Sequence, residues 1–468
     1  MEGFVDGSGL FAVARHREAA HRVYLGLHAL QHRGGLGVGI AVSDGEFIRH
    51  HRGAGTVAEV AGGPQLQALT GTAAIGLVFG NPADESPVLD GGGGDEMVFC
   101  RYRDGQLAVA LSGRFTNGTR LRAELQASGA VFRSGSDAEV LTHLLAHSGQ
   151  RTLVNRLVDA LWKVEGAFSL VMCTEDRLIA VRDPRGFRPL VTGVAGDAVM
   201  FATEDSAIRY AGGEVHRELD PGEMVIVDAR GVQRVTPFTK RPQTSCVQEY
   251  TSLAGPQVRV FGHEVYEVRI GLGQRLAREE PCSEARVVVG LPGNGDAAAV
   301  GYARTARIPL ECALIRNPRG RRNVEAPPSA MAGFAARQAF TVVPGAVEER
   351  VVVLVVNSLV TGAIVKLAIA QLRAAKVLAV HLRVASPPVR AGCPYGVSAP
   401  TTEELAFNAQ GDPAALCAAL GATTIGFLSA DGLHAVVGRR VDGSPMYCDA
   451  CFSGNFPVPP EEPDDQLK

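Results

Sequence analysis

The chain of 468 residues carries 46 Lys and Arg against 49 Asp and Glu, which gives a formal net charge of −3 at pH 7. A chain of this length is expected to form two domains, each large enough to bury most of its apolar surface. The balanced charge argues against nucleic acid or a membrane surface as the main partner, because such binders concentrate Lys and Arg. No apolar run approaches the roughly 18 residues of a membrane span, and no signal peptide is visible. We therefore expect a soluble, cytoplasmic protein.

The first two hundred or so residues alternate short apolar runs with turns. Residues 37–42, 107–111 and 168–172 form such runs, and helical patterns cover 118–128 and 138–147. Strands at this density, with helices between them, predict a layered α+β domain.

The later part of the chain has a different pattern. Residues 287–291, 351–356 and 377–380 are continuous apolar runs separated by helix-like segments. Strands of a parallel sheet that is buried on both faces have this pattern. Polar and proline-rich residues interrupt both patterns at 237–244, so we place the domain junction there.

A family resemblance rests on several ordered motifs. They are GLHALQHRG at 26–34, DPRGFRPL at 183–190, DPGEM at 220–224, ASPP at 385–388 and ACFSG at 450–454. On these motifs nearly the whole chain resembles the glutamine phosphoribosylpyrophosphate amidotransferases, or amidophosphoribosyltransferases, which catalyse the first committed step of purine synthesis.

The resemblance implies the fold class and the domains. It implies an α+β N-terminal-nucleophile hydrolase sandwich of the glutamine amidotransferase type 2 class at residues 8–238. An α/β type I phosphoribosyltransferase domain is expected to follow at 245–440. The last part, 441–468, is expected to be a segment with a cysteine pair and a disordered tail, because it ends acidic and rich in proline.

Ser8 stands where the family keeps its catalytic cysteine. By the resemblance, that cysteine becomes the first residue after processing and attacks the glutamine amide, with its own α-amino group as base. A hydroxyl is far less ionised than a thiol at neutral pH and needs a strong base. Cleavage after Gly7 would supply that base. The alternative, which we favour at this point, is that Ser8 begins an ordinary strand and residues 1–7 stay attached.

The implied glutamine pocket has changed as well. Phe79 replaces the family's arginine that clamps the glutamine α-carboxylate, and Ser112 replaces its oxyanion asparagine. Losing one such donor costs about 10²–10³ in rate in comparable sites. Gly113 and Asp137 remain as a residual glutamine site, although a lone Asp near a helix start is often a cap. Glutamine hydrolysis is therefore not expected.

The implied phosphoribosyl site has changed in the same way. Where the family has two carboxylates that hold the ribose hydroxyls, this chain has Val356 and Asn357. Asn357, Ser358 and Gly362 are interpreted as a residual phosphate loop, and the pyrophosphate loop implied at 292–295 is altered. Backbone N–H groups after Gly362 could cradle an anion, but the segment also fits an ordinary strand-to-helix turn. We do not expect Mg²⁺ at this site.

A basic loop is a further candidate site. By the resemblance, residues 316–323 match the loop that closes over substrate, and they contain four arginines. They fit a phosphorylated small molecule or an acidic partner surface. A solvated charged loop is the alternative reading.

Four of the nine cysteines match the cluster ligands of one branch of the family. Cys246, Cys393, Cys448 and Cys451 each lie in the matching local context, which implies a [4Fe–4S] cluster, because iron and sulfide favour thiolate donors. Zinc in a Cys₄ site is the leading alternative, and four free thiols are a third. The other five cysteines lack ligand spacing and are interpreted as core residues, as at Cys312.

These changes together lead to the expectation of a non-catalytic paralogue, a pseudoenzyme with a structural or regulatory role. Its partners would be a second copy of the chain in a homo-oligomer, or an active family member in a hetero-oligomer. The first alternative is an enzyme repurposed for another acyl or phosphoribosyl transfer, with Ser8 as nucleophile or with the arginine-rich loop as a clamp for an anion. The second is an ordinary amidophosphoribosyltransferase of purine biosynthesis.

Overall fold

The computed structural model describes residues 5–35, 37–80, 97–317, 340–398 and 401–461. These residues form two compact units. The N-terminal unit comprises the described residues of Asp6–Cys246, Cys393–Ser398 and Phe456–Lys468, and the C-terminal unit comprises those of Met1–Val5, Val247–Gly392 and Ala399–Asn455. Residues 462–468 of the predicted tail and 318–323 of the basic loop lie outside the described residues.

Two antiparallel sheets pack face to face in the N-terminal unit. Leu10 and Ala12 of one sheet share a buried core with Ala108 and Ala110 of the other. The first sheet has the order β12 (Glu214–Glu218), β10 (Val191–Ala195), β11 (Ala198–Ala202), β2 (Ser8–Ala14), β5 (Ala73–Phe79), β3 (Gly37–Ser43), β4 (Ile48–Ala54). The second has the order β14 (Gly231–Val235), β13 (Met224–Asp228), β9 (Arg177–Arg182), β8 (Gly166–Thr174), β7 (Gly105–Phe115), β6 (Met97–Tyr102).

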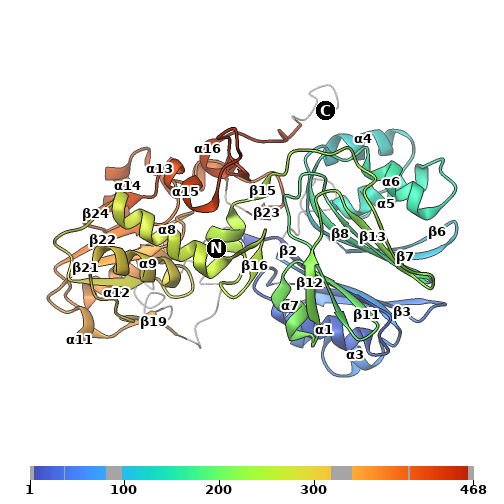
Figure 1. The fold of residues 1–468 in the computed structure, drawn as a ribbon, viewed down its shortest axis with the longest axis horizontal. Coiled ribbons are helices and arrows are strands. Elements are labelled where there is room, and N and C mark those ends of the chain that lie inside the picture. The colour runs from blue at the N-terminus through green and yellow to red at the C-terminus, as the bar shows by residue number, and fades with distance from the viewer. Residues whose placement is uncertain (1–4, 36, 81–96, 318–339, 399–400, 462–468) are drawn as a thin grey trace. The chain divides into compact units, whose positions relative to one another are not determined.

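Helices cover the outer faces of both sheets. Figure 1 shows α1 and α3 beyond the first sheet and α4, α5 and α6 beyond the second, so the layers run helix, sheet, sheet, helix. This is the layered α+β sandwich that the strand density predicted. The helices are α1 (Ala19–Ala29), α2 (Val57–Ala61), α3 (Pro64–Gln67), α4 (Gly118–Ala127), α5 (Asp137–His147), α6 (Leu153–Leu161) and α7 (Asp205–Tyr210).

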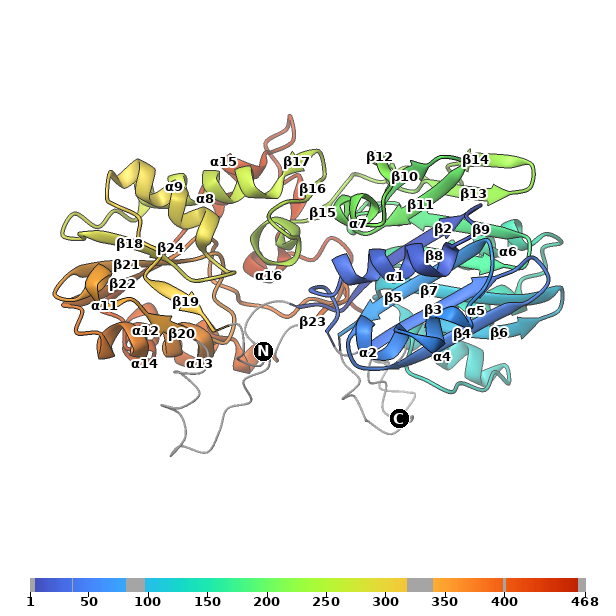
Figure 2. The ribbon, with the colours of Figure 1, turned by 90° about the horizontal axis from the view of Figure 1, so that it is seen from below.

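The C-terminal unit is built on a parallel sheet with helices on both faces. Figure 2 shows α8 and α9 on one side of the sheet and α12 and α14 on the other. The strand order is β18 (Val287–Gly290), β21 (Val351–Val356), β22 (Ala379–Val384), β24 (Thr424–Phe427). The main helices are α8 (Val265–Glu279), α9 (Asp296–Ala306), α12 (Ala363–Ala374), α14 (Pro413–Leu420) and α15 (Ala430–Val437).

One predicted strand of this sheet is misplaced. The apolar run at 377–380 predicts a strand there, but β22 covers Ala379–Val384. Leu378 is 64% exposed and precedes the strand. The apolar run stops early because His381 and Arg383 are buried polar residues inside β22.

The remaining elements are short. They are β1 (Val5–Asp6), β15 (Ser245–Cys246), β16 (Arg259–Val260), β17 (His263–Glu264), β19 (Leu314–Arg316), β20 (Phe340–Val342), β23 (Val397–Ser398), β25 (Tyr447–Cys448), α11 (Pro344–Val347), α13 (Ala406–Gln410), α16 (Ala450–Ser453), a π-helix at Glu249–Leu253 and a 3₁₀ turn at Thr402–Glu404. None of the helices in the described parts of the chain has the length and apolar character needed to cross a bilayer.

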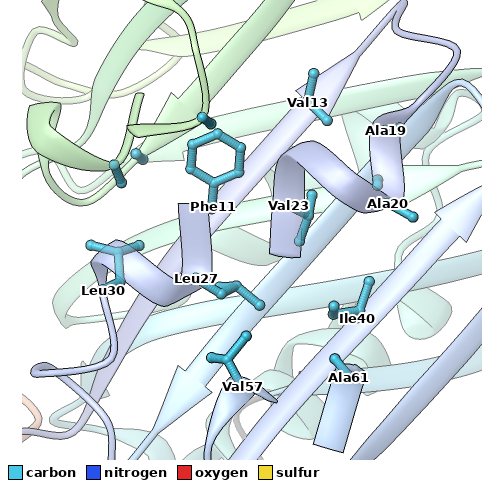
Figure 3. Close-up of a cluster of buried hydrophobic side chains, with 14 of the residues drawn as sticks. Phe11, Val13, Ala19, Ala20, Val23, Leu27, Leu30, Ile40, Val57 and Ala61 are labelled. Atoms are coloured by element: carbon cyan, nitrogen blue, oxygen red, sulfur yellow. The ribbon is translucent and has the colours of Figure 1, made fainter. Parts of the chain in front are cut away.

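Strand β2 is buried on both faces. Because successive side chains of a strand point to opposite sides, Leu10 and Ala12 face the second sheet while Phe11 and Val13 face α1. Figure 3 shows Phe11 packed beside Val23 and Leu27 of α1. The strand that begins at Ser8 is therefore held by two separate cores.

A buried ion pair fixes the segment that follows α1. Arg33 Nε lies 2.7 Å from Glu204 Oε1, and both side chains are 0% exposed. His32 Nε2 lies 2.9 Å from the same oxygen. Burial acts to raise the pKa of Glu204, but the charges of Arg33 and His32 and their hydrogen bonds outweigh it, so the pKa falls to about 2. Glu204 is therefore ionised at neutral pH.

Helices α8 and α9 make backbone contact that tolerates no side chain, which generates the first prediction. A Cβ on Gly273 would lie 1.9 Å from Ala298 O. The variant Gly273→Ala is expected to lose about 1–3 kcal/mol of unfolding free energy, although alanine favours the helix by about 1 kcal/mol. Chemical denaturation would measure the change. Gly149→Ala is the control, because nothing lies within 4 Å of a Cβ there; equal stability of the two variants would contradict the packing argument.

The Arg33–Glu204 pair generates a second prediction. Glu204→Gln leaves a buried guanidinium without its counter-charge and is expected to lower the unfolding free energy by about 3–5 kcal/mol at neutral pH. Because the folded-state pKa of Glu204 is depressed to about 2 from a reference of 4.5, the stabilisation is complete above that reference and is lost as the pH falls toward 2.

Denaturation of wild type and variant at neutral and acid pH tests both statements. The difference between them should shrink as the pH falls below about 4.5. Glu46→Gln, at an exposed turn, should change neither value. A difference that is independent of pH would show that Glu204 is not stabilised as a carboxylate.

Candidate functional site

Ser8 lies at the first position of β2 and is fully buried. Its side chain is 0% exposed, and its Oγ has no hydrogen-bond partner. The preceding residue is held too, because Gly80 N donates a hydrogen bond of 2.8 Å to Gly7 O. A buried hydroxyl without a partner is costly, so Ser8 Oγ is a group that a bound ligand could satisfy.

Phe79 lies directly beside Ser8. In the antiparallel register, Phe79 of β5 is opposite both Ser8 of β2 and Gly37 of β3. Its ring covers Gly37, since a Cβ there would lie 2.0 Å from Phe79 Cε2. An apolar ring thus stands beside Ser8 where the resemblance implies a cationic clamp.

Strand β7 brings Ser112 and Gly113 to the same place. Ser112 Oγ donates to Ser8 O at 3.2 Å, and it lies 3.4 Å from the buried guanidinium of Arg188. Gly113 has φ +126°, and a Cβ there would lie 2.1 Å from Ala167 O. The backbone at Gly113 therefore requires glycine. The structure brings Ser8, Phe79, Ser112 and Gly113 together.

Asp137 contacts the end of the same strand, β7. It is the first residue of α5, and its Oδ2 accepts a hydrogen bond of 2.8 Å from Phe115 N. The N-cap role belongs to Ser136, whose side chain accepts from Ala138 N. Burial raises the pKa of Asp137, while the bond from Phe115 N–H acts to lower it. Asp137 therefore ties α5 to β7 two residues beyond Gly113.

The second candidate site lies at the carboxyl end of β21. Asn357 follows the last residue of that strand and is 4% exposed, and its Oδ1 has no hydrogen-bond partner. Its backbone N donates a hydrogen bond of 3.0 Å to Asn294 O, in the segment that the resemblance matches to the family's pyrophosphate loop. In open α/β sheets, ligands bind at the carboxyl ends of the strands. Asn357 and Asn294 are placed where that rule puts a ligand.

The residues after Asn357 form the turn into α12. Ser358 Oγ lies 2.8 Å from Ser252 Oγ. Gly362 is the N-cap of α12 with φ +79°, a left-handed conformation that favours glycine. The helix therefore begins directly after the strand–turn segment that carries Asn357.

Two of the predicted cluster ligands belong to the N-terminal unit. Cys246 is buried, and its N–H donates to Phe187 O at 3.0 Å. Tyr395 N donates to Cys393 Sγ at 3.4 Å. Burial raises the pKa of Cys393, and the N–H groups of Tyr395 and Val397 act to lower it.

The other two belong to the C-terminal unit. Cys448 and Cys451 are each 7% exposed. Gln248 Nε2 donates to Cys451 Sγ at 3.1 Å, and Val247 N donates to Cys448 O at 3.1 Å. N–H donors to sulfur stabilise thiolates and tune the groups that thiolates hold. The donor chemistry of the four thiols fits an iron–sulfur cluster and also fits zinc.

The interpretation of the other cysteines as core residues is only partly correct. Cys173 is 0% exposed, and burial raises its pKa to about 12. Cys312 is exposed and is not a core residue; the apolar residues around it misled the interpretation. Cys282 is buried but lies in a cluster with Glu284 and His381, which sequence reasoning missed.

Arg188 was also missed as a site residue. It is 1% exposed and reaches Ser112. Its motif, 183–190, supported the family resemblance. An arginine inside such a motif is a signal in the sequence that could have identified it as a candidate. Sequence reasoning treated that motif as a family marker only.

Comparison with known proteins gives one family over nearly the whole chain. Residues 88–210 match the family model of a glutamine amidotransferase domain. The chain is 36% identical over 463 residues to the amidophosphoribosyltransferase of Bacillus subtilis (strain 168), which covers 98% of this chain and 95% of that relative. It is 38% identical over 454 residues to the chloroplastic amidophosphoribosyltransferase of Vigna aconitifolia, with 97% and 92% covered. A solved structure described as the allosteric regulatory enzyme of purine biosynthesis superposes with a TM-score of 0.90 at 36% identity, over 97% of each chain.

These comparisons confirm the predicted fold class. The superposition runs through both units, so the glutamine amidotransferase sandwich is followed by the phosphoribosyltransferase-type fold that the resemblance implied. No segment long enough to be a domain is left outside the match.

The expectation of a non-catalytic structural or regulatory paralogue is wrong. Relatives that match 97–98% of this chain carry the name of an enzyme, and the match favours an active enzyme of purine biosynthesis. The expectation gave too much weight to single replacements such as Ser8, Phe79 and Asn357, which do not by themselves demonstrate lost catalysis. The chain belongs to the amidophosphoribosyltransferase family.

Proposed function

We propose that this chain is an amidophosphoribosyltransferase of purine biosynthesis. It would release ammonia from the glutamine side-chain amide and place it on the anomeric carbon of phosphoribosyl pyrophosphate, with pyrophosphate as leaving group. The observation that carries the proposal is the match to enzymes of this name over 97–98% of the chain. A homo-oligomer, which the resemblance implies, is part of the proposal.

The amide half of the reaction is assigned to the pocket around Ser8. Ser8 Oγ is buried and has no hydrogen-bond partner, so it is free to attack the amide carbonyl. Cleavage after Gly7 would give Ser8 a free α-amino group, which would take the hydroxyl proton and pass it to the departing ammonia. Water would then release glutamate from the Ser8 ester. The N–H of Gly113 is proposed to stabilise the oxyanion.

Phe79 changes how glutamine is held. An aromatic ring beside Ser8 excludes water, which strengthens the remaining electrostatic contacts, but it cannot pair with the α-carboxylate of glutamine. Binding of glutamine is therefore expected to be weak, and the acyl step is expected to be slower by about 10²–10³ where Ser112 replaces an oxyanion donor.

The phosphoribosyl half is assigned to the end of β21. Asn357 Oδ1 is buried without a hydrogen-bond partner and is proposed to accept a hydrogen bond from a ribose hydroxyl. The first N–H groups of α12, after Gly362, are proposed to bind the 5′-phosphate, because a helix amino terminus attracts anions.

A [4Fe–4S] cluster on Cys246, Cys393, Cys448 and Cys451 is also proposed. The N–H donors to Cys393 Sγ and Cys451 Sγ support it, because such bonds favour the thiolate form that binds iron. When bound, the cluster would cross-link its ligands and so supply folding stability. Zinc on the same thiols is the alternative outcome.

Ser8 variants give the first functional prediction. Phosphoribosylamine formation is assayed with glutamine and, separately, with ammonium as the nitrogen donor. Ser8→Ala is expected to lower the glutamine-dependent rate by roughly 10³-fold or more and to leave the ammonium-dependent rate unchanged, because ammonia bypasses the amide step. Ser8→Cys should raise the glutamine-dependent rate, since a thiol ionises more readily.

Intact mass is the companion measurement, and it should show the loss of residues 1–7 in the wild type. An unprocessed chain, or a Ser8→Ala variant as active with glutamine as the wild type, would reject the assignment of Ser8. Absence of product from either nitrogen donor would reject the proposed function.

The cluster gives a separate prediction. Protein purified without oxygen should contain iron and sulfide in equal amounts and be brown, and Cys451→Ser should lose both. Cys173→Ser is the control, because that thiol is buried in the inter-sheet core. Colourless wild-type protein that contains zinc would reject the cluster.

A further inference from the structure

Cys282, Glu284 and His381 gather on one side of the C-terminal unit. Cys282 and Glu284 lie in the connection between α8 and β18, and His381 lies in β22. One donor atom from each of the three side chains lies within 4.8 Å of the other two. Sulfur, carboxylate oxygen and imidazole nitrogen meet here although almost a hundred residues separate the two segments.

His381 presents a ring nitrogen to this cluster. The residue is 2% exposed, and its Nδ1 lies 2.8 Å from Thr424 Oγ1. Its Nε2 lies 3.0 Å from Glu284 Oε1 but has no hydrogen-bond partner. Nε2 thus faces the carboxylate without hydrogen-bond geometry, and it offers a lone pair in the tautomer in which Nδ1–H donates to Thr424 Oγ1.

We propose that Cys282, Glu284 and His381 bind a zinc ion, with the fourth position open to water. A set of one sulfur, one nitrogen and one oxygen ligand suits the borderline-soft zinc ion better than Mg²⁺ or Ca²⁺, which prefer oxygen alone. Zinc–ligand bonds of about 2.0–2.3 Å place neighbouring donors about 3.3–3.7 Å apart. A shift of Glu284 can bring the three donors to these distances, because its side chain is 66% exposed.

The zinc site is distinct from the phosphoribosyl site. His381 pairs in register with Val353, three residues before the end of β21, which places it about 10 Å along the strand from Val356. Val380, Leu382 and Val384 pack in the core that includes α12, so His381 and Arg383 point to the opposite face. The ion would fasten the α8–β18 connection to β22 and act on stability rather than on substrate.

Thr424 is a positioning residue for this site. Its Oγ1 holds His381 Nδ1 and also accepts from Arg383 at 3.1 Å. Loss of such a partner typically costs about 10–100-fold in metal affinity, because it fixes the ring and its tautomer. Thr424→Val should therefore weaken zinc binding without removing a ligand.

The test is zinc binding to the full-length protein, measured by competition with a chromogenic chelator and by the rise of Tm with added zinc. Wild type should bind one zinc per chain more than Cys282→Ser or His381→Asn, and Thr424→Val should bind it about 10–100-fold more weakly. Cys417→Ser is the control, because that thiol is half-buried in the same unit but donates to Ala422 O; it should bind zinc as the wild type does.

Cobalt replaces zinc in a second measurement that does not depend on stability. The thiolate-to-cobalt charge-transfer band should fall in Cys282→Ser and persist in Cys451→Ser, so the site is separated from the four-cysteine group. Equal zinc stoichiometry and affinity in wild type, Cys282→Ser and His381→Asn would overturn the proposal. So would a cobalt band that Cys282→Ser leaves intact.

Discussion

Two buried polar atoms without hydrogen-bond partners determine which parts of the fold must be rigid. Ser8 Oγ lies at the start of β2 and Asn357 Oδ1 directly after β21. An unsatisfied buried polar group costs about 1–3 kcal/mol, so the surrounding structure has to hold each one in place. Around Ser8 this is done by the two cores on either face of β2 and by the Arg33–Glu204 pair. Around Asn357 it is done by a parallel strand covered by helices on both faces.

The replacements around Ser8 change its surroundings in a consistent direction. Phe79 supplies an apolar wall where the resemblance implies a cation, and Ser112 binds the backbone of Ser8. Arg188 is buried, and its guanidinium donates to Ser112 Oγ. The neighbours of Ser8 are thus an apolar ring and a hydroxyl, and the buried guanidinium of Arg188 contacts Ser112. In such surroundings each remaining dipole counts for more, because little water competes with it.

Sequence patterns predicted the strands and helices well where the pattern is continuous. The runs at 37–42, 107–111 and 168–172 lie within β3, β7 and β8, and the helical patterns at 118–128 and 138–147 match α4 and α5. Prediction failed at β22, because buried polar residues broke the apolar run. Alternation of apolar residues cannot reveal that His381 and Arg383 find partners inside the fold.

In the candidate sites, residues that are close in sequence could be predicted, and residues that only the fold brings together could not. Residues that are near in sequence, such as Asn357 and Gly362, could be assigned together from a motif. Residues that meet only through strand register could not: Phe79 beside Ser8 follows from the pairing of β2 with β5, and Cys282 beside His381 follows from the fold of the parallel sheet. The wrong expectation of a non-catalytic protein has a related cause. It was based on the replaced side chains alone and did not consider the fold that surrounds them.

Transfer of isotope from glutamine tests the central claim most directly. The protein is incubated with phosphoribosyl pyrophosphate and glutamine labelled with ¹⁵N at the side-chain amide, and the trapped phosphoribosylamine is analysed by mass spectrometry. The account predicts that the product carries ¹⁵N and that glutamate accumulates in equal amount. Product that remains unlabelled while unlabelled ammonium is present, or no product at all, would contradict it.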